Sequence, residues 1–250
     1  YPPASFTRGG GTSFFGFYNS PTALPRYLND AGYHVIFFEP CDLTFSNTAN
    51  WLHSNGFDEI IGGDDPRFDG SPRFVFKSAP DSISLERAAE FVDQLNDPLY
   101  FLYIMTVTNH TPFVDPHTGV HSHDLAARYT DRAVGRFYNH LVEKNFFEEG
   151  ILIIVGDHRA MVPLVPGEHQ LFGERAAALV PLIIATGKRE EERIEGQFQQ
   201  IDLYNSIVSR VTGRRCTSPW RGELMSEQPT PAQFIFHRRG DVRTDYSIFS

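Results

Sequence analysis

The sequence has little cysteine, and its two cysteines, Cys41 and Cys216, lie far apart in the chain. Two such residues form neither a disulfide framework nor the close spacing of a structural zinc site. We expect two free thiols, with a single bridge as the alternative. The redox state of the protein's compartment is therefore left open.

The sequence also lacks an excess of positive charge and a long apolar run. Its 22 Lys and Arg residues face 31 Asp and Glu residues, which gives a net charge of −9 with His neutral. A nucleic-acid-binding domain normally carries a basic surface, so this balance argues against a nucleic-acid partner. The longest apolar runs, at 151–155 and 179–185, have the length of strands rather than of membrane spans. No segment has the pattern of a signal peptide.

Apolar runs alternate with amphipathic patterns in the 250 residues, 41% of which are hydrophobic. Strands are predicted at 34–38, 98–108, 151–155 and 179–185, and helices at 21–32, 46–56, 81–96, 124–144 and 200–213. Ser46 or Asn47 is the expected cap of the second helix, and Asp124 of the fourth. Two further strand-like runs follow at 233–239 and 245–249. This alternation predicts an α/β fold with a mainly parallel central sheet flanked by helices.

The predicted strands after residue 97 are apolar nearly throughout, so we expect them to be buried on both faces. No repeat or Pro/Ser linker divides the chain, and we interpret residues 1–250 as one domain. Within it we expect a loop at 1–20, an α/β core at 21–213 and a C-terminal extension at 214–250. The acidic loop at 62–80 lacks the spacing of a calcium-binding loop.

Two predicted strands end in loops with reactive side chains. Residues 98–108 lead into His110, and residues 151–155 lead into Asp157 and His158. Ligands of such sheets bind at the carboxyl ends of the strands, so these loops can converge. A carboxylate and a neutral imidazole are suitable ligands for a divalent ion. The alternative is that Asp157 caps a turn and His158 packs locally.

Other candidates have a weaker basis. His110 can bind an anion or protonate a leaving oxygen, or can simply bond to a nearby carbonyl. Arg159 can bind phosphate or sulfate through two N–H groups, or pair with a surface acid. His169 is a further substrate-binding candidate. No residue next to Thr12 or Ser13 can act as a base, so both are weak candidates for a nucleophile.

The residues together resemble the extracellular catalytic domain of the lipoteichoic acid synthase family, phosphoglycerol transferases of the sulfatase and alkaline-phosphatase superfamily. The resemblance covers residues 20 to 210, in order. It rests on LPRYLNDAGYHVIFF, SNGFDEIIG, FLYIMTVTNHTPF, ARYTDRAVGRFYNHL and ILIIVGDHRAM…VPLIIA.

The resemblance implies an alkaline-phosphatase/sulfatase-like fold whose N-terminal part is missing. It implies that Asp157 and His158 bind one catalytic divalent ion, typically manganese, with magnesium, calcium or zinc possible. His110 matches the family's substrate-pocket histidine. The family's threonine nucleophile and its glutamate ligand would lie upstream of Tyr1, so we expect the chain alone to be inactive.

By the same resemblance, the substrate would be a phosphate ester linked to a phospholipid or glycan of the cell envelope. An upstream anchor would hold the domain at the membrane, facing the periplasm or the cell exterior. The family's His-Trp-Arg set, which grips glycerol phosphate, is replaced by Glu39, Ser46 and Thr48. Asp42, Phe45 and Asn47 remain in that loop. Two alternatives follow, a sulfatase and a non-catalytic binding module.

Overall fold

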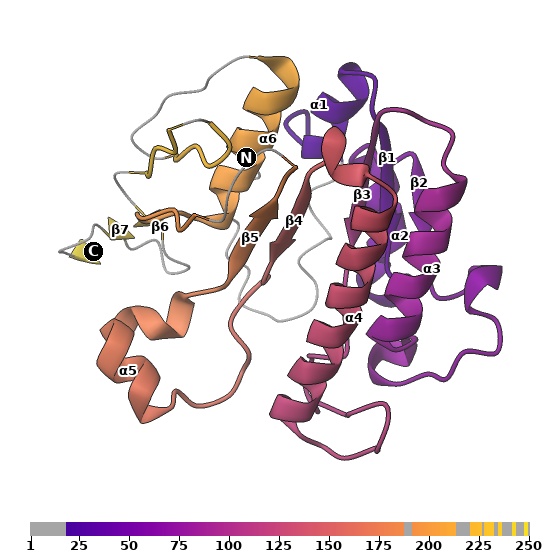
Figure 1. The fold of residues 1–250 in the computed structure, drawn as a ribbon, viewed down its shortest axis with the longest axis horizontal. Coiled ribbons are helices and arrows are strands. Elements are labelled where there is room, and N and C mark those ends of the chain that lie inside the picture. The colour runs from indigo at the N-terminus through magenta and orange to yellow at the C-terminus, as the bar shows by residue number, and fades with distance from the viewer. Residues whose placement is uncertain are drawn as a thin grey trace.

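The computed structural model describes residues 19–187, 192–213, 221–226, 228–232, 235–236, 242–243 and 248–249. Helices and strands alternate over much of this part (Figure 1). The helices are α1 (Leu24–Asp30), α2 (Thr48–Ser54), α3 (Asp81–Gln94), α4 (His123–Glu143), α5 (Pro166–Phe172) and α6 (Gln200–Thr212). The strands are β1 (His34–Phe38), β2 (Glu59–Ile61), β3 (Tyr100–Ile104), β4 (Leu152–Val155), β5 (Leu182–Ala185), β6 (Ile235–Phe236), β7 (Val242–Arg243) and β8 (Ile248–Phe249). None of the described helices has the length and apolar character that a membrane span requires.

Strands β1, β2 and β3 form a parallel sheet in the order β2-β1-β3. Phe38 of β1 lies opposite Ile61 of β2 and Ile104 of β3. Strands β4 and β5 form a separate antiparallel pair, with Leu152 opposite Ala185. The expected α/β class is therefore confirmed, and the parallel arrangement holds for the first three strands but not for the β4–β5 pair.

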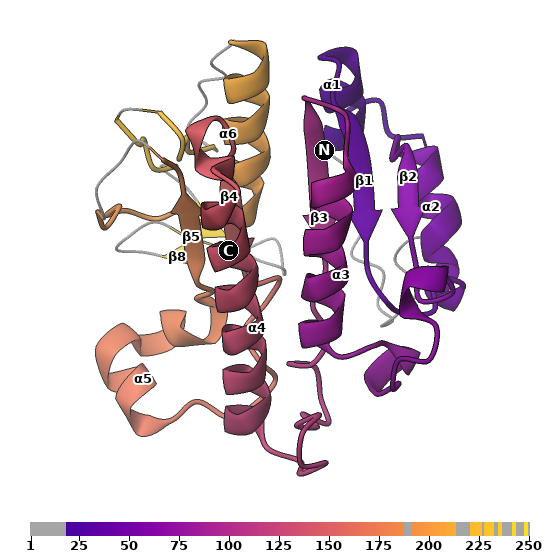
Figure 2. The same ribbon diagram turned by 45° about the vertical axis from the view of Figure 1, so that its right-hand side comes forward.

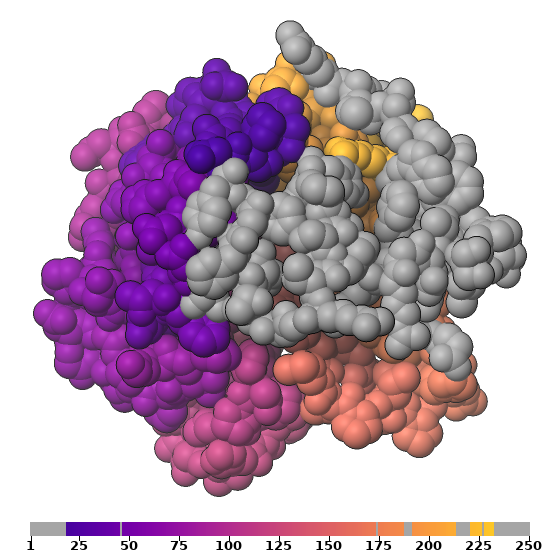
Figure 3. All heavy atoms as spheres, turned by 180° about the vertical axis from the view of Figure 1, so that it is seen from behind, coloured from indigo at the N-terminus to yellow at the C-terminus, as the bar shows by residue number. Residues whose placement is uncertain are grey.

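The loops after several strands lie at one end of the molecule. In Figures 1 and 2, α4 rises from the lower end, and β4 then descends toward α5, in the same direction as β1 and β3. The loop after β3 and helix α5 therefore occupy the same end, which is at the bottom of Figure 3. The expected convergence of the strand ends is thus built into the topology.

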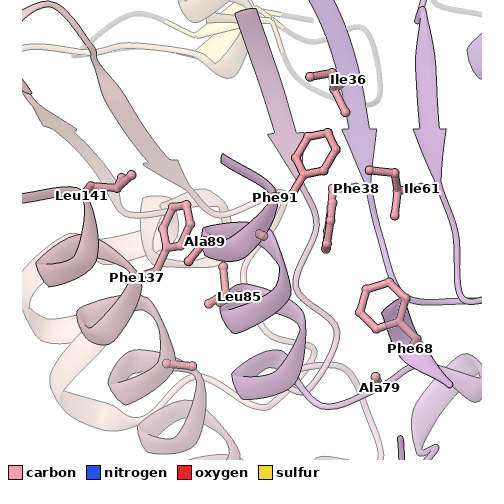
Figure 4. Packing of buried hydrophobic residues seen from close by; sticks show 12 residues of the cluster. Ile36, Phe38, Ile61, Phe68, Ala79, Leu85, Ala89, Phe91, Phe137 and Leu141 are labelled. Atoms are coloured by element: carbon pink, nitrogen blue, oxygen red, sulfur yellow. The ribbon is translucent and has the colours of Figure 1, made fainter. Parts of the chain in front are cut away.

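Alternating side chains of β1 serve two apolar clusters, as expected for a strand covered on both faces. Ile36 and Phe38 point toward α3 and α4 and belong to the larger cluster, seen in Figure 4 with Phe91 and Phe137. Phe37 belongs to the smaller cluster, which includes residues of α2 such as Leu52. Helix α4 has one apolar stripe toward the core, and all its members are buried: Ala126, Tyr129, Ala133, Phe137 and Leu141.

Later strands are less buried than their composition predicts. Tyr103 is 44% exposed, Val155 40% and Ile183 56%, so burial on both faces is a wrong prediction here. The cause is that, among the described residues, β3 has a strand on one side only, and β4 and β5 pair only with each other. Apolar composition alone does not reveal a strand's place within a sheet.

Two caps were predicted with different success. Asn47 occupies the capping position of α2, with φ at 60° and no side-chain capping bond. Helix α4 is instead capped by Ser122, whose hydroxyl accepts from the Leu125 N–H at 3.3 Å. Asp124, the predicted cap, lies inside the first turn and pairs with Arg128 at 2.9 Å. Ser122 is the cap because it stands just before the helix, where its side-chain oxygen can reach the backbone N–H groups of the first turn, which have no partner within the helix.

The extension at 214–250 is described only in part. The strands expected at 233–239 and 245–249 are found as β6 and β8, with β7 between them in an antiparallel sheet. The loop at 1–20 lies almost entirely outside the described residues, as do Thr12, Ser13 and Cys216. Cys41 is a buried free thiol.

The carboxylate of Asp81 joins three segments at the carboxyl end of β3. It is 1% exposed and accepts from the backbone N–H groups of Val107 at 2.8 Å and Thr108 at 3.1 Å. Its other oxygen accepts from the Thr130 hydroxyl at 2.6 Å. The Asp81 N–H donates to the Thr108 hydroxyl at 3.1 Å. The start of α3, the loop after β3 and helix α4 are therefore linked through one buried group.

We expect Asp81→Ala to lower the free energy of unfolding by about 3 kcal/mol or more, because it leaves two buried N–H groups without an acceptor. Asp81→Asn should cost much less, because the amide oxygen can still accept from both N–H groups while the amide nitrogen faces the Thr130 hydroxyl. Urea unfolding of both variants would measure this. Equal losses would contradict the role assigned to this carboxylate.

Candidate functional site

The end of β1 carries the first acidic side chain of the site. Glu39 follows the last residue of β1, and its N–H donates to the Ile61 carbonyl at 3.0 Å. Partial burial raises the pKa of the Glu39 carboxyl above its ordinary value of 4.5, against a smaller opposing effect of a hydrogen bond with Cys41. Further along this loop, the hydrogen bonds from Thr44 hold the pKa of Asp42 below its ordinary value, with the nearby Lys77 ammonium adding to the effect.

The loop after β3 presents His110. The backbone N–H of His110 donates to the Val107 carbonyl and its own carbonyl accepts from the Phe113 N–H, both at 2.9 Å. The ring Nδ1 lies 2.7 Å from the Thr111 carbonyl oxygen. Because a carbonyl only accepts, Nδ1 carries the proton, and in the neutral ring Nε2 keeps its lone pair. Since Asp81 holds Val107, this loop depends directly on that buried carboxylate.

Exposed aromatic rings adjoin His110. The Phe76 ring stands edge-on to the imidazole with 4.7 Å between centroids, and Phe45 lies 5.8 Å from Phe76. Phe45 is 61% exposed and Phe76 45%. The backbone of Phe76 is left-handed, with φ at 52°, an unfavourable conformation for a bulky residue. The packing of its ring against His110 gives this strained turn a local contact.

Asp157 and His158 form the turn directly after β4. The Asp157 Oδ2 and the His158 Nε2 are 3.4 Å apart, and the two side chains are 74% and 55% exposed. His158 Nδ1 is 2.8 Å from the Arg159 carbonyl, so Nδ1 carries the proton and Nε2 can act as a ligand. Two ligand atoms around one tetrahedral ion lie about 3.4 Å apart. This pair therefore fits two positions of a divalent ion.

The remaining ligands of such an ion are not apparent in the described part of the chain. No group of three or more His, Cys, Asp or Glu side chains there is arranged to hold a metal. The described residues therefore offer two possible ligand atoms at this turn, those of Asp157 and His158.

Arg159 is engaged within its own loop. Its guanidinium donates to the carbonyls of Ala160 at 3.0 Å and Val162 at 2.7 Å, and to Glu168 at 2.6 Å. Only 16% of the Arg159 side chain is exposed. Glu168 also accepts from the Val165 N–H. This hydrogen bond is the main reason that the pKa of the Glu168 carboxyl lies below its ordinary value, and the hydrogen bond from Arg159 adds to the effect. An anion reaching this arginine would compete with Glu168, and substrate binding by Arg159 stays a prediction.

His169 lies on α5, at the same end of the molecule as the loop after β3 (Figure 1). Its side chain is exposed. Its role in substrate binding also stays a prediction.

The phenol of Tyr103, in β3, is influenced by the charges of two carboxylates that follow other strands. Burial raises the pKa of its phenol above the ordinary value of 10.0, and the nearby charges of Asp157 and Glu39 raise it further. Its ring stacks on Phe37 at 5.7 Å. The Tyr103 phenol is therefore close enough to the carboxylates that follow β1 and β4 to feel their charge. Sequence reasoning missed it, because a tyrosine inside an apolar strand looks like a core residue.

Three comparisons with known proteins agree on the family. A family model described as Sulfatase matches residues 3–213. Lipoteichoic acid synthase of Staphylococcus aureus (strain USA300) is 29% identical over 154 residues, which cover 56% of this chain and 23% of that protein. The lipoteichoic acid synthase of Staphylococcus saprophyticus is 29% identical over 90 residues, or 31% of this chain and 14% of that protein. The chain thus spans less than a quarter of these relatives.

Solved structures share the fold. Lipoteichoic acid synthase LtaP from Listeria monocytogenes aligns with a TM-score of 0.60 at 18% identity, over 75% of this chain and 51% of that chain. An alkaline phosphatase superfamily protein from Vibrio parahaemolyticus aligns with a TM-score of 0.59 at 19% identity, over 92% and 59%. These alignments confirm the alkaline-phosphatase/sulfatase-like fold, and the family-model match places the chain in a family: it belongs to the sulfatase family.

Proposed function

We propose that this chain is part of a metal-dependent phosphotransferase or hydrolase that acts on phosphate esters, such as phosphoglycerol groups of a cell-envelope lipid or glycan. The observation that carries the proposal is the facing pair of Asp157 Oδ2 and His158 Nε2, 3.4 Å apart at the carboxyl end of β4. The similarity to lipoteichoic acid synthases supports phosphate rather than another ester.

In this proposal Asp157 and His158 are ligands of one divalent ion, with manganese as the first candidate. Such an ion, when bound, neutralises charge on the reacting group and lowers the pKa of a hydroxyl. When its ring is protonated, His110 donates from Nε2–H to the phosphoryl oxygens or gives that proton to the departing alcohol. The nucleophile is not assigned to a residue of this chain. His169 and Arg159 are proposed as further substrate contacts.

The domain and its location are part of the same proposal. Residues 1–250 would belong to one catalytic domain, with the core at 21–213 and an extension at 214–250. The substrate class implies a domain that faces the periplasm or the cell exterior and is held near the membrane. This location rests on the resemblance to lipoteichoic acid synthases alone.

A sulfatase is the second candidate, favoured by the family model that matches residues 3–213. The same pair of ligands would serve a sulfate ester. The identity of the nucleophile distinguishes the two, since a cysteine or serine in a C/S-x-P-x-R motif indicates a sulfatase and a threonine indicates phosphotransfer. A non-catalytic binding module is the third candidate. It is suggested by Glu39, which stands where lipoteichoic acid synthases carry a residue that binds glycerol phosphate.

We expect Asp157→Ala and His158→Ala each to weaken Mn²⁺ binding at least about ten-fold, because each removes one ligand of the ion. Electron paramagnetic resonance of Mn²⁺ titrated with the protein measures this directly, without an activity assay. Asp97→Ala is the matched control, since Asp97 pairs with His34 at 3.0 Å near the starts of β1 and β3. Unchanged affinity in both site variants would count against the proposed metal site.

Glu39→Gln tests the partly buried carboxyl that follows β1. The pKa of Glu39 is higher in the folded chain than its ordinary value of 4.5. The folded state therefore holds the proton more tightly, and the free energy of unfolding falls as the pH rises from 4.5 through the folded pKa. Glutamine is neutral throughout, so the variant should be more stable than the parent at pH 7.

This gain should shrink at about pH 4, below the ordinary pKa, where the parent carboxyl is mostly protonated in both states. Urea midpoints at the two pH values provide the comparison. Glu86→Gln, on a side chain that is 65% exposed, controls for the loss of one negative charge. A Glu39→Gln effect that is the same at both pH values would argue against a buried, penalised carboxylate.

A further inference from the structure

The first residue of α6 contacts the turn that carries the candidate metal ligands. The side-chain Nε2 of Gln200 donates to the Gly156 carbonyl at 2.6 Å and to the Asp157 carbonyl at 2.7 Å. These partners are separated from Gln200 by 44 and 43 residues. A primary amide has two N–H groups and can therefore satisfy both acceptors.

The two carbonyls that Gln200 binds belong to the peptide groups on either side of the Asp157 Cα. Each peptide group is a rigid plane, so the relative orientation of the two planes is set by φ and ψ of Asp157 alone. One nitrogen that holds both carbonyls therefore restricts both angles. The direction of the Asp157 Cβ, and with it the carboxylate, follows from them.

A backbone hydrogen bond also anchors the turn. The Gly156 N–H donates to the Pro181 carbonyl at 3.1 Å, which fixes the turn to the segment before β5. The His158 backbone N–H donates to the Asp157 Oδ1 at 2.8 Å, so a rotated Asp157 would also lose this contact with the neighbouring residue. The ligand pair is exposed, and apolar packing contributes little to its geometry.

We propose that Gln200 is a positioning residue that holds Asp157 and His158 in the geometry for a divalent ion. This inference rests on the proposed function, in which the two residues bind that ion. The role requires a hydrogen-bond donor at position 200. Glutamate has the same shape but offers only acceptors to the two carbonyls, so it should open the turn rather than hold it.

The first test needs no metal. Hydrogen exchange of the Gly156 and His158 amides, followed by NMR, should be about ten-fold faster in Gln200→Ala and Gln200→Glu, because the turn loses two hydrogen bonds. Gln200→Arg, which keeps N–H donors in a fork, should restore slow exchange. Gln94→Glu, at the far end of α3, is the matched control for the added charge. If the two amides exchange in Gln200→Glu at the same rates as in the parent protein, the proposed role of Gln200 is wrong.

The second test separates positioning from charge. Glutamate at 200 adds a negative charge close to the ligands, and attraction alone would tighten Mn²⁺ binding. Positioning predicts the opposite sign, with at least about ten-fold weaker binding in both Gln200→Glu and Gln200→Ala, as for other groups that orient metal ligands. Tighter binding in Gln200→Glu with no change in Gln200→Ala would overturn the proposal.

The two tests fail independently. In one case the parent protein does not bind Mn²⁺, but the amides still exchange faster in Gln200→Glu. The assignment of Asp157 and His158 as metal ligands is then wrong, and Gln200 makes a structural contact only. If Mn²⁺ binding depends on Asp157 but not on Gln200, the metal site stands and the positioning role is wrong.

Discussion

The buried carboxylate of Asp81 is the constraint on which much of this arrangement depends. It begins α3, accepts from the loop after β3 and bonds to Thr130 of α4. A carboxylate this far from water is tolerated only when its oxygens are satisfied. Each of its partners is therefore fixed in place, and His110 stands two residues beyond the last backbone group that it holds. The core and the candidate site share this one anchor.

Much of the fold could be predicted from the sequence, because periodicity reports directly on which side of an element meets the core. The apolar stripe of α4, whose members are all buried, is of this kind. Strand β2 was missed because its three residues, Glu59–Ile61, are too short to show a period. Helix α5 was missed because Pro166 and Gly167 weaken its helical pattern, and its residues are not buried. The exposure of β3 and β4 depends on their neighbours in space, which no local pattern records.

The candidate site shows the same division. Adjacent residues after a strand must share a turn, so the proximity of Asp157 and His158 followed from their order in the chain. The use of Arg159 within its loop depends on Glu168. The raised pKa of Tyr103 depends first on its burial and then on the charges of Asp157 and Glu39. Such contacts between distant segments become visible only once the strands are placed. The two remaining ligand positions of the proposed ion have no such candidates among the described residues.

The left-handed backbone of Phe76 has an evolutionary consequence. A bulky residue in this conformation costs about 1–3 kcal/mol, which glycine would avoid. Selection for stability alone would therefore favour glycine at position 76, and it would remove the ring that stands against His110. Phenylalanine at this position therefore carries a conformational cost that its ring contact with His110 can offset. Related chains that carry glycine at this position would be expected to have given up whatever the exposed rings of Phe45 and Phe76 contact.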